Sequence, residues 1–363
     1  MRSLSYLSQI FLFLCFASLL LIVSCANLGP KTLKSERSNY NVAVQRTNDE
    51  ELLLNLVRLK YRDTPFFMEV SSMASQFILS TKANASASLQ NGVKGLFGLG
   101  GSLGVTEKPT VTYSPLQGDR FIQRVLSPLP LDTITLLFNS GWNIERIFRL
   151  CFQRMNNLKN APGASGPTPS RSPYFIEFIS AVKYLRLLQI EDAINLSYQE
   201  ENGVPQLILN INDADKNRAE ARQFALAANV EPGKTRYVLA FSADSNKTNH
   251  IRVVTRSLLG IMFYISQAVE VPSKDISKGK VTQTQTRDGK IFDWDKVMGD
   301  LLKIRSASEK PQEYPMTIFY RGSWFYINDS DLSSKSTFSL LSQIFSLQAG
   351  KIKDNAPLLT LPI

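Results

Sequence analysis

Hydrophobic residues recur along most of the chain at spacings typical of helices or strands. The clearest helix begins in 47–50, which fits a capping box; its apolar stripe includes Leu53, Leu56 and Val57, and Pro65 ends it. Similar spacing predicts helices over 119–127, 131–139, 143–158, 174–189, 213–229, 255–269 and 337–348, and another within 289–304. Strands are predicted over 66–76 and 236–241, with hairpins over 190–199/204–211 and 314–320/324–328. Because helices are mixed with hairpin-joined antiparallel strands, we expect an α+β fold.

The Gly- and Ala-rich segment 77–105 alternates strictly between two kinds of residue. Odd positions are mostly apolar or small, and even positions are polar or Gly apart from Ile78 and Leu96. This period of two predicts a long β-hairpin. A three-residue loop over 90–92 would place Gly92 where a positive φ is needed and would pair Ala85 with Phe97.

This hairpin permits two interpretations. Its arms exceed the roughly 9–11 residues that a tilted strand needs to cross a bilayer. One hairpin cannot close a barrel, but a ring of identical subunits could. The alternative is a soluble hairpin with one buried face. The soluble hairpin is favoured, because the apolar face is rich in Ala and Gly and has no Trp or Tyr girdle.

The N-terminus resembles the signal peptide of a bacterial lipoprotein. Arg2 is the only charged residue in 1–24, and residues 10–23 are apolar except for Ser18. This length suits a signal-peptide core and is short for a membrane span. The sequence Ile-Val-Ser before Cys25 resembles a lipobox, in which the Cys thiol takes a diacylglyceryl group and the chain is cut before it. We therefore predict that Cys25 is lipidated; the alternative is an uncleaved N-terminal helix with an incidental Cys.

The sequence divides into five predicted parts. Residues 1–24 form the signal peptide, 25–40 a polar tether, and 41–160 a helical region that bears the hairpin. Residues 161–173 contain four Pro and two Gly and are predicted to be an exposed linker. An α+β domain over 174–363 follows. An extended tether over 26–38 would reach about 40 Å from the membrane.

Composition excludes several classes of protein. The chain has 363 residues, a formal net charge of +10, one His and three Cys. Sites that need several His or paired Cys are therefore disfavoured, and Cys151 would be the only unmodified Cys after lipidation and cleavage. The positive charge is scattered without a basic run, so nucleic acid is not expected as a partner. We expect no cofactor, no metal site and no catalytic residue.

Three short motifs resemble functional ones but lack the required context. Residues 228–235 match a loose phosphate-loop pattern, yet a helix is predicted before them and a strand after, the reverse of what phosphate binding needs. Residues 213–224 open like a calcium loop without its Gly or Glu, so Asp213 or Asp215 is expected to cap a helix. Ser180 and Lys183 fall within a predicted helix, and His250 is expected in a polar loop.

Several stretches resemble a family of uncharacterised Gram-negative envelope lipoproteins. They are the lipobox, residues 49–70, 109–120 and 320–347, and the segment 356–362. The resemblance implies a location and a class but carries no activity. With Ala26 after Cys25, it implies export to the outer membrane, with the protein held on its periplasmic face.

Two functions remain open from the sequence. One is a non-enzymatic structural or interaction role in an envelope or secretion assembly, with the membrane, other copies of the chain or envelope proteins as partners. The other is a carboxylate-dependent hydrolase that acts on an envelope polymer. The acids available to it are Glu200, Glu201, Asp293, Asp295, Asp329 and Asp331. Their local spacing is typical of solvated or capping groups, which favours the first function.

Overall fold

The computed structural model describes residues 28–87, 97–116, 118–167, 169, 171–242, 247–312 and 316–350. The helices are α2 (Leu28–Lys60), α3 (Asp119–Leu126), α4 (Leu131–Asn139), α5 (Ile144–Cys151), α6 (Ile176–Ile190), α7 (Ala219–Ala227), α8 (Leu258–Ile265), α9 (Ser273–Ser277), α10 (Asp295–Met298) and α11 (Leu332–Gly350), with 3-10 turns η1 (Pro162–Ser165) and η2 (Ser266–Ala268). The strands are β1 (Met68–Ala87), β2 (Phe97–Pro115), β3 (Phe152–Met155), β4 (Leu158–Lys159), β5 (Ile194–Glu201), β6 (Val204–Ile211), β7 (Arg236–Ala240), β8 (His250–Thr255), β9 (Arg305–Ala307), β10 (Thr317–Tyr320) and β11 (Ser323–Tyr326). This mixture confirms the α+β class.

A six-stranded sheet organises the folded body. Its order is β4-β3-β8-β7-β6-β5, antiparallel except for the parallel pair β7–β8. The predicted hairpin β5–β6 turns at Asn202 and Gly203, whose φ values are +52° and +74°. The second predicted hairpin, β10–β11, turns at Arg321 and Gly322, with φ values of +50° and +77°, and joins β9 in a three-stranded sheet. Both turns have the positive φ pair that matches strand twist.

One contiguous core joins the sheets and helices. Helix α5 contacts α6 and α8, and α6 also contacts α7, β4 and β5. The C-terminal half of α2 inserts its apolar stripe, with Leu53, Leu56 and Val57 fully buried. Burying such side chains is the main stabilising contribution to a body of this size.

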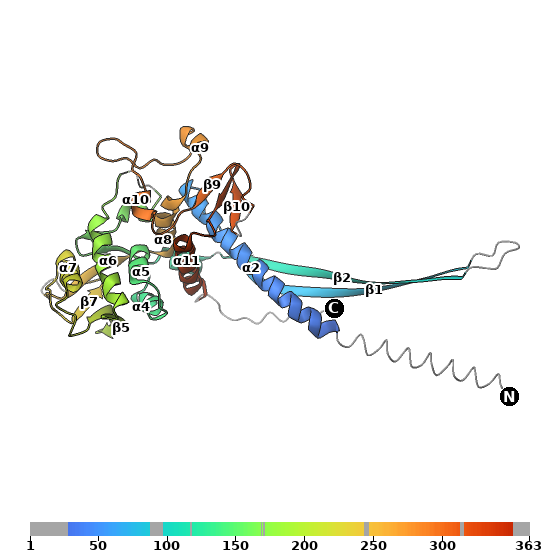
Figure 1. Cartoon of the computed structure of the whole chain (residues 1–363), viewed down its shortest axis with the longest axis horizontal. Coiled ribbons are helices and arrows are strands. Elements are labelled where there is room, and N and C mark those ends of the chain that lie inside the picture. Colours follow the sequence, from blue (N-terminus) through green and yellow to red (C-terminus); the bar gives the residue numbers. More distant parts are fainter. Residues whose placement is uncertain are drawn as a thin grey trace, which may run out of the picture.

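A long antiparallel ribbon, β1–β2, extends away from this body (Figure 1). It begins at Met68 and ends at Pro115, so the strand predicted over 66–76 is continuous with the hairpin arm. Ala85 pairs with Leu99 and not with Phe97, so the predicted register is wrong by two residues. A shift of two leaves every residue on its original face, so alternation alone cannot distinguish these registers. The predicted turn at 90–92 lies outside the described residues.

Two predicted boundaries need correction. The extended tether over 25–40 is helical from Leu28 onward, because α2 continues back to that residue. The linker over 161–173 is not an exposed connector: Ala161 and Ala164 are buried, and the Ser172 N–H donates to the Gln285 carbonyl at 2.8 Å. The six-stranded sheet also takes strands from both sides of this segment, so 161–173 does not separate two domains.

The helix predicted over 143–158 ends at Cys151. Asn143 caps its start as an acceptor for the Glu145 N–H at 2.8 Å. Beyond Cys151 the chain turns into β3, which pairs with β8. The remote Arg256 supplies the reason, because its backbone N–H donates to the Cys151 carbonyl at 2.6 Å and its side chain binds the preceding carbonyls.

Candidate functional site

The β1–β2 ribbon is the candidate functional element. Within the described residues, β1 and β2 pair only with each other, so each strand leaves one edge without a backbone partner. The register runs from Met68 opposite Pro115 to Ala87 opposite Phe97, with one irregularity near Val70. Long unpaired edges are templates for further strand pairing.

A buried asparagine on α2 fixes the entry to the ribbon. The Asn55 side chain donates from Nδ2 to the Phe66 carbonyl at 2.7 Å and accepts the Phe66 N–H at 3.0 Å. It thereby bonds both backbone groups of one residue, as a neighbouring strand would. Asn55 is fully buried among the leucines of the α2 stripe. A polar residue within an apolar stripe was the sequence signal for this contact, and sequence analysis missed it.

Further contacts hold the next two residues. Glu51 accepts the Met68 N–H at 2.7 Å, and Leu116 donates its N–H to the Phe67 carbonyl at 2.9 Å. Burial raises the pKa of Glu51, although the Met68 N–H and Arg58 act in the opposite direction. We call the contacts of Asn55, Glu51 and Leu116 with residues 66–68 the hairpin clamp.

Aromatic packing strengthens the clamp. The Phe67 ring lies 5.9 Å from that of Phe121 in α3 and 5.1 Å from that of Phe345 in α11. Phe67 is 6% exposed, whereas its neighbours Phe66 and Met68 are more than 40% exposed. The base of the ribbon is therefore held by α2 at the backbone of Phe66 and Met68, and by α3 and α11 at the buried ring of Phe67, so its movements are restrained.

Side-chain contacts also hold the C-terminal end of α2. Tyr61 donates its hydroxyl to Asp275 at 2.8 Å, and Asp275 also pairs with Lys280 at 2.6 Å. Asp63 accepts from the Tyr320 hydroxyl at 2.6 Å and pairs with Arg321 at 2.8 Å. These contacts tie α2 to α9 and to the β10–β11 hairpin, so α2 is a rigid support for the ribbon.

The ribbon and the N-terminal part of α2 leave the body on the same side (Figure 1). Cys25 lies outside the described residues, three positions before the start of α2 at Leu28. The predicted lipidation of Cys25 is therefore placed by sequence only. The part of α2 from Leu28 to the clamp residue Glu51 is about 36 Å long.

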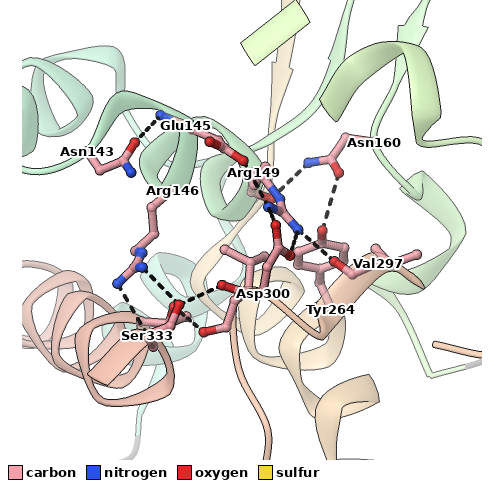
Figure 2. A network of polar contacts seen from close by, with 11 residues as sticks. Asn143, Glu145, Arg146, Arg149, Asn160, Tyr264, Val297, Asp300 and Ser333 are labelled. Atoms are coloured by element: carbon pink, nitrogen blue, oxygen red, sulfur yellow. Dashed lines mark hydrogen bonds and ion pairs between the residues drawn. The ribbon is translucent and has the colours of Figure 1, made fainter. Parts of the chain in front are cut away.

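A buried arginine network supports the opposite part of the body. Figure 2 shows Arg149 between Glu145 and Asp300, with N–O distances of 3.0 Å and 2.7 Å. Burial lowers the pKa of Arg149, but the hydrogen bonds to Asp300 and the electrostatic effects of Tyr264, Asp300 and Glu145 together outweigh burial and raise it. Arg146 reaches Ser333 on α11, whose hydroxyl donates to the Asp300 carbonyl at 2.6 Å.

Arg256 is buried beside this network and binds carbonyl groups. Its guanidinium donates to the carbonyls of Arg149, Leu150 and Phe152 at 2.9, 3.1 and 2.7 Å, and to that of Asn160. Among the described residues no carboxylate pairs with it. Burial lowers its pKa to about 10. Arg256 thus places its charge at the carbonyl end of α5, where a cation is favourable.

The acids named for the hydrolase have local roles on separate elements. Asp293 accepts the Asp295 N–H at 3.0 Å, and Asp331 accepts the Ser334 N–H at the start of α11. The other partners are Tyr198 for Glu200, Gln206 for Glu201, Lys303 for Asp295 and Lys335 for Asp329. Each of these six acids therefore has a hydrogen-bond or ion-pair partner that is not a second carboxylate of the set.

The remaining motif residues occupy ordinary structural positions. Residues 228–235 lie between α7 and β7, which confirms the reversed context. Asp213 and Asp215 pair with Lys216 and Arg218 before α7 begins at Ala219, so the predicted cap is wrong. Ser180 and Lys183 lie in α6, as predicted. His250 is the first residue of β8, so its predicted place in a loop is wrong.

Burial also determines the reactivity of Cys151, the one cysteine among the described residues. Cys151 is 0% exposed, and burial raises its pKa to about 12. The thiol is therefore unreactive at neutral pH. The described residues contain no group of three or more His, Cys, Asp or Glu that could hold a metal ion.

No helix in the described ranges combines the length and apolar character that membrane crossing requires. Comparison of the chain with known protein families, curated proteins and solved structures found no match.

Proposed function

We propose that this chain is a lipid-anchored envelope protein on the periplasmic face of the outer membrane, with a structural role in an oligomeric assembly. In this assembly, the β1–β2 ribbons of neighbouring copies pair edge to edge. Cys25 carries the lipid, and α2 connects the anchor to the folded body.

The observation that carries this proposal is the length of the unpaired ribbon. An isolated two-stranded hairpin is marginally stable in water, and stable sheets need further strands or a packed face. A strand of 20 residues is about 65 Å long. Pairing with neighbours would supply the missing hydrogen bonds along this whole length. The rigid clamp supports the same function, because it would present every ribbon at the same angle.

The charge distribution along the ribbon favours pairing. The charged residues of β1 and β2 are Glu69, Lys82, Glu107 and Lys108, and none occurs in 97–106. Edge strands usually avoid association through charges placed along them. The distal part of β2 lacks this protection, so it is suited to contact another strand.

The register supports a two-faced ribbon. Beyond the irregularity near Val70, Leu79 lies opposite Val105 and Thr81 lies opposite Leu103, so odd positions pair with odd positions from there to Ala87. Directly opposite residues in an antiparallel pair share one face. A barrel of such ribbons would have the odd positions of 77–87 and 97–105, which are mostly apolar or small, toward lipid and the even positions toward the lumen.

The direction of the anchor agrees with this arrangement. Since α2 and the ribbon leave the body on the same side, a lipid on Cys25 would place the membrane on the ribbon side (Figure 1). Two or three acyl chains give stable attachment where one does not. The folded body would then face the periplasm.

Single-Cys labelling tests the proposal in membranes. Ala85→Cys introduces a thiol at an odd position, and Ser86→Cys is the matched control at the adjacent even position. Because Cys151 is buried, the introduced thiol would dominate labelling. We expect a lipid-phase maleimide to label Ala85→Cys and a water-soluble maleimide to label Ser86→Cys. Equal labelling of both variants by the water-soluble reagent alone would exclude membrane insertion.

A further inference from the structure

A second site lies at the end of α2 that is distant from Cys25. It is a cavity of about 450 Å³. One wall is formed by residues 267–271 after α8, and the others by 281–284 and 291–295. Met298 and Leu302, which are almost fully buried, also line the cavity. Its lining is mainly aliphatic and aromatic, as in pockets that bind small molecules.

The walls are held by their own contacts. Trp294 donates its Nε1–H to the Thr284 hydroxyl at 2.9 Å, and its ring contacts that of Phe292 at 5.2 Å in an edge-on geometry. On the other side, the Glu270 N–H donates to the Ile304 carbonyl at 2.8 Å. These contacts join segments distant in sequence, so the cavity is formed without a ligand.

Lys60 places an amino group in this apolar surrounding. Its Nζ donates to Gln267 Oε1 at 3.0 Å. No carboxylate of the described part of the chain pairs with it. Burial lowers the pKa of this amine to about 8. A desolvated ammonium is costly unless an anion accompanies it, so the amine is suited to pair with an anionic ligand.

Four of the five other charged side chains that line the cavity form two ion pairs. Glu270 lies 3.9 Å from Arg305, and Asp295 lies 3.2 Å from Lys303. Asp293 accepts the N–H of Asp295. Glu270, Asp293, Asp295 and Arg305 are exposed, whereas Lys60 is half-buried against the apolar walls and has no carboxylate partner among the described residues. An anion that enters the cavity would therefore find its counter-charge at Lys60.

We propose that this cavity binds a small amphipathic carboxylate, such as a medium-chain fatty acid. Its chain would contact the aromatic and aliphatic walls, and its carboxylate would pair with the Lys60 ammonium. A carboxylate fits better than a phosphate, because phosphate sites usually combine several donors. The other two cations of the lining, Lys303 and Arg305, already lie beside Asp295 and Glu270, which leaves Lys60 for the ligand. This proposal is independent of ribbon pairing.

Fluorescence quenching provides the test. The full chain is held in amphipol, which avoids detergent micelles, and titrated with octanoate that carries bromine on its terminal carbon. Bromine quenches nearby indole emission, and Trp294 lines the cavity. We expect saturable quenching that the Trp294→Phe variant lacks. The matched bromo-octanol and bromo-octyltrimethylammonium should bind at least about tenfold more weakly, since they cannot form the charged hydrogen bond.

A pair of variants identifies the role of the charge. Lys60→Met keeps most of the aliphatic stem and should lower carboxylate affinity about tenfold or more, to that of the alcohol. Lys296→Met removes an exposed lysine of α10 outside the lining and should bind as the wild type does. Unchanged carboxylate affinity in Lys60→Met would overturn the proposal. So would equal binding of all three probes by the wild type, a result that needs no variant.

Discussion

Replacement of Arg256 by Met should destabilise the protein strongly, although this removes a buried charge. In the wild type, its guanidinium satisfies carbonyls at the end of α5 and donates from Nε to the Ser165 hydroxyl at 2.9 Å. It also lies 3.8 Å from the centre of the Tyr264 ring. Methionine would fill similar space but donate no hydrogen bond.

The magnitude follows from the groups left behind. The carbonyls of Arg149 and Phe152 also accept from Asn160 Nδ2, at 2.8 and 2.7 Å, so they would keep a partner. Those of Leu150 and Asn160 would lose the bond from Arg256. An unsatisfied buried acceptor costs about 1–3 kcal/mol. After allowance for relief of the buried charge, we expect a loss of about 3–5 kcal/mol in unfolding free energy.

Urea unfolding followed by far-ultraviolet circular dichroism measures this loss as a lower midpoint. Arg252→Met is the matched control, because Arg252 lies on the same strand β8 with an exposed side chain. It should change the unfolding free energy by no more than about 0.5 kcal/mol. If the two variants unfold at the same midpoint, the role assigned to Arg256 is wrong.

Three further predictions concern the clamp, the lysine and the anchor. Asn55→Ala should increase hydrogen exchange at Phe66 and cost about 2–3 kcal/mol, because two hydrogen bonds are lost; unaltered exchange would contradict the clamp. Lys60→Met should raise the unfolding free energy by about 2–3 kcal/mol below pH 8, because the folded wild type must keep a buried amine charged there. That gain should shrink as the pH rises from 8 and disappear above 10.5, where the unfolded amine also loses its proton, and a pH-independent gain would refute this origin. Cys25→Ala should abolish acyl labelling and leave the precursor uncut; normal processing would exclude lipidation at this residue.

The local elements could be predicted where local physics determines them. The turns at Asn202-Gly203 and Arg321-Gly322 each place a glycine between two predicted strands, and both turns are present. Asn202 also tolerates a positive φ, whereas Arg321 adopts it without such a preference. The end of α5 could not be predicted, because apolar spacing continues into β3 and the group that binds its carbonyls is Arg256, about a hundred residues later. The same remote residue bonds Ser165 and helps to bury a segment whose Pro and Gly content indicates a linker.

The candidate sites also differ in how far the sequence predicts them. The ribbon was visible in the alternation of 77–105, but its register was ambiguous because shifts of two residues conserve the pattern. Asn55 was detectable as a polar residue in an apolar stripe, although its partner was not. The Lys60 cavity left no sequence signal, because residues 267–305 approach the end of α2 only in the folded chain.

The mass of the intact assembly tests ribbon pairing most directly. Native mass spectrometry of the lipidated protein, extracted in mild detergent, measures how many copies associate. We predict a single closed multimer that dissociates when Leu99→Lys introduces a charge at an odd position of β2, whereas Gly98→Ser at the neighbouring even position preserves it. A lysine at the bilayer midplane costs about 2–4 kcal/mol per copy. The proposed assembly would be contradicted by a protein that is monomeric at all concentrations while hydrogen exchange shows that its ribbon is ordered.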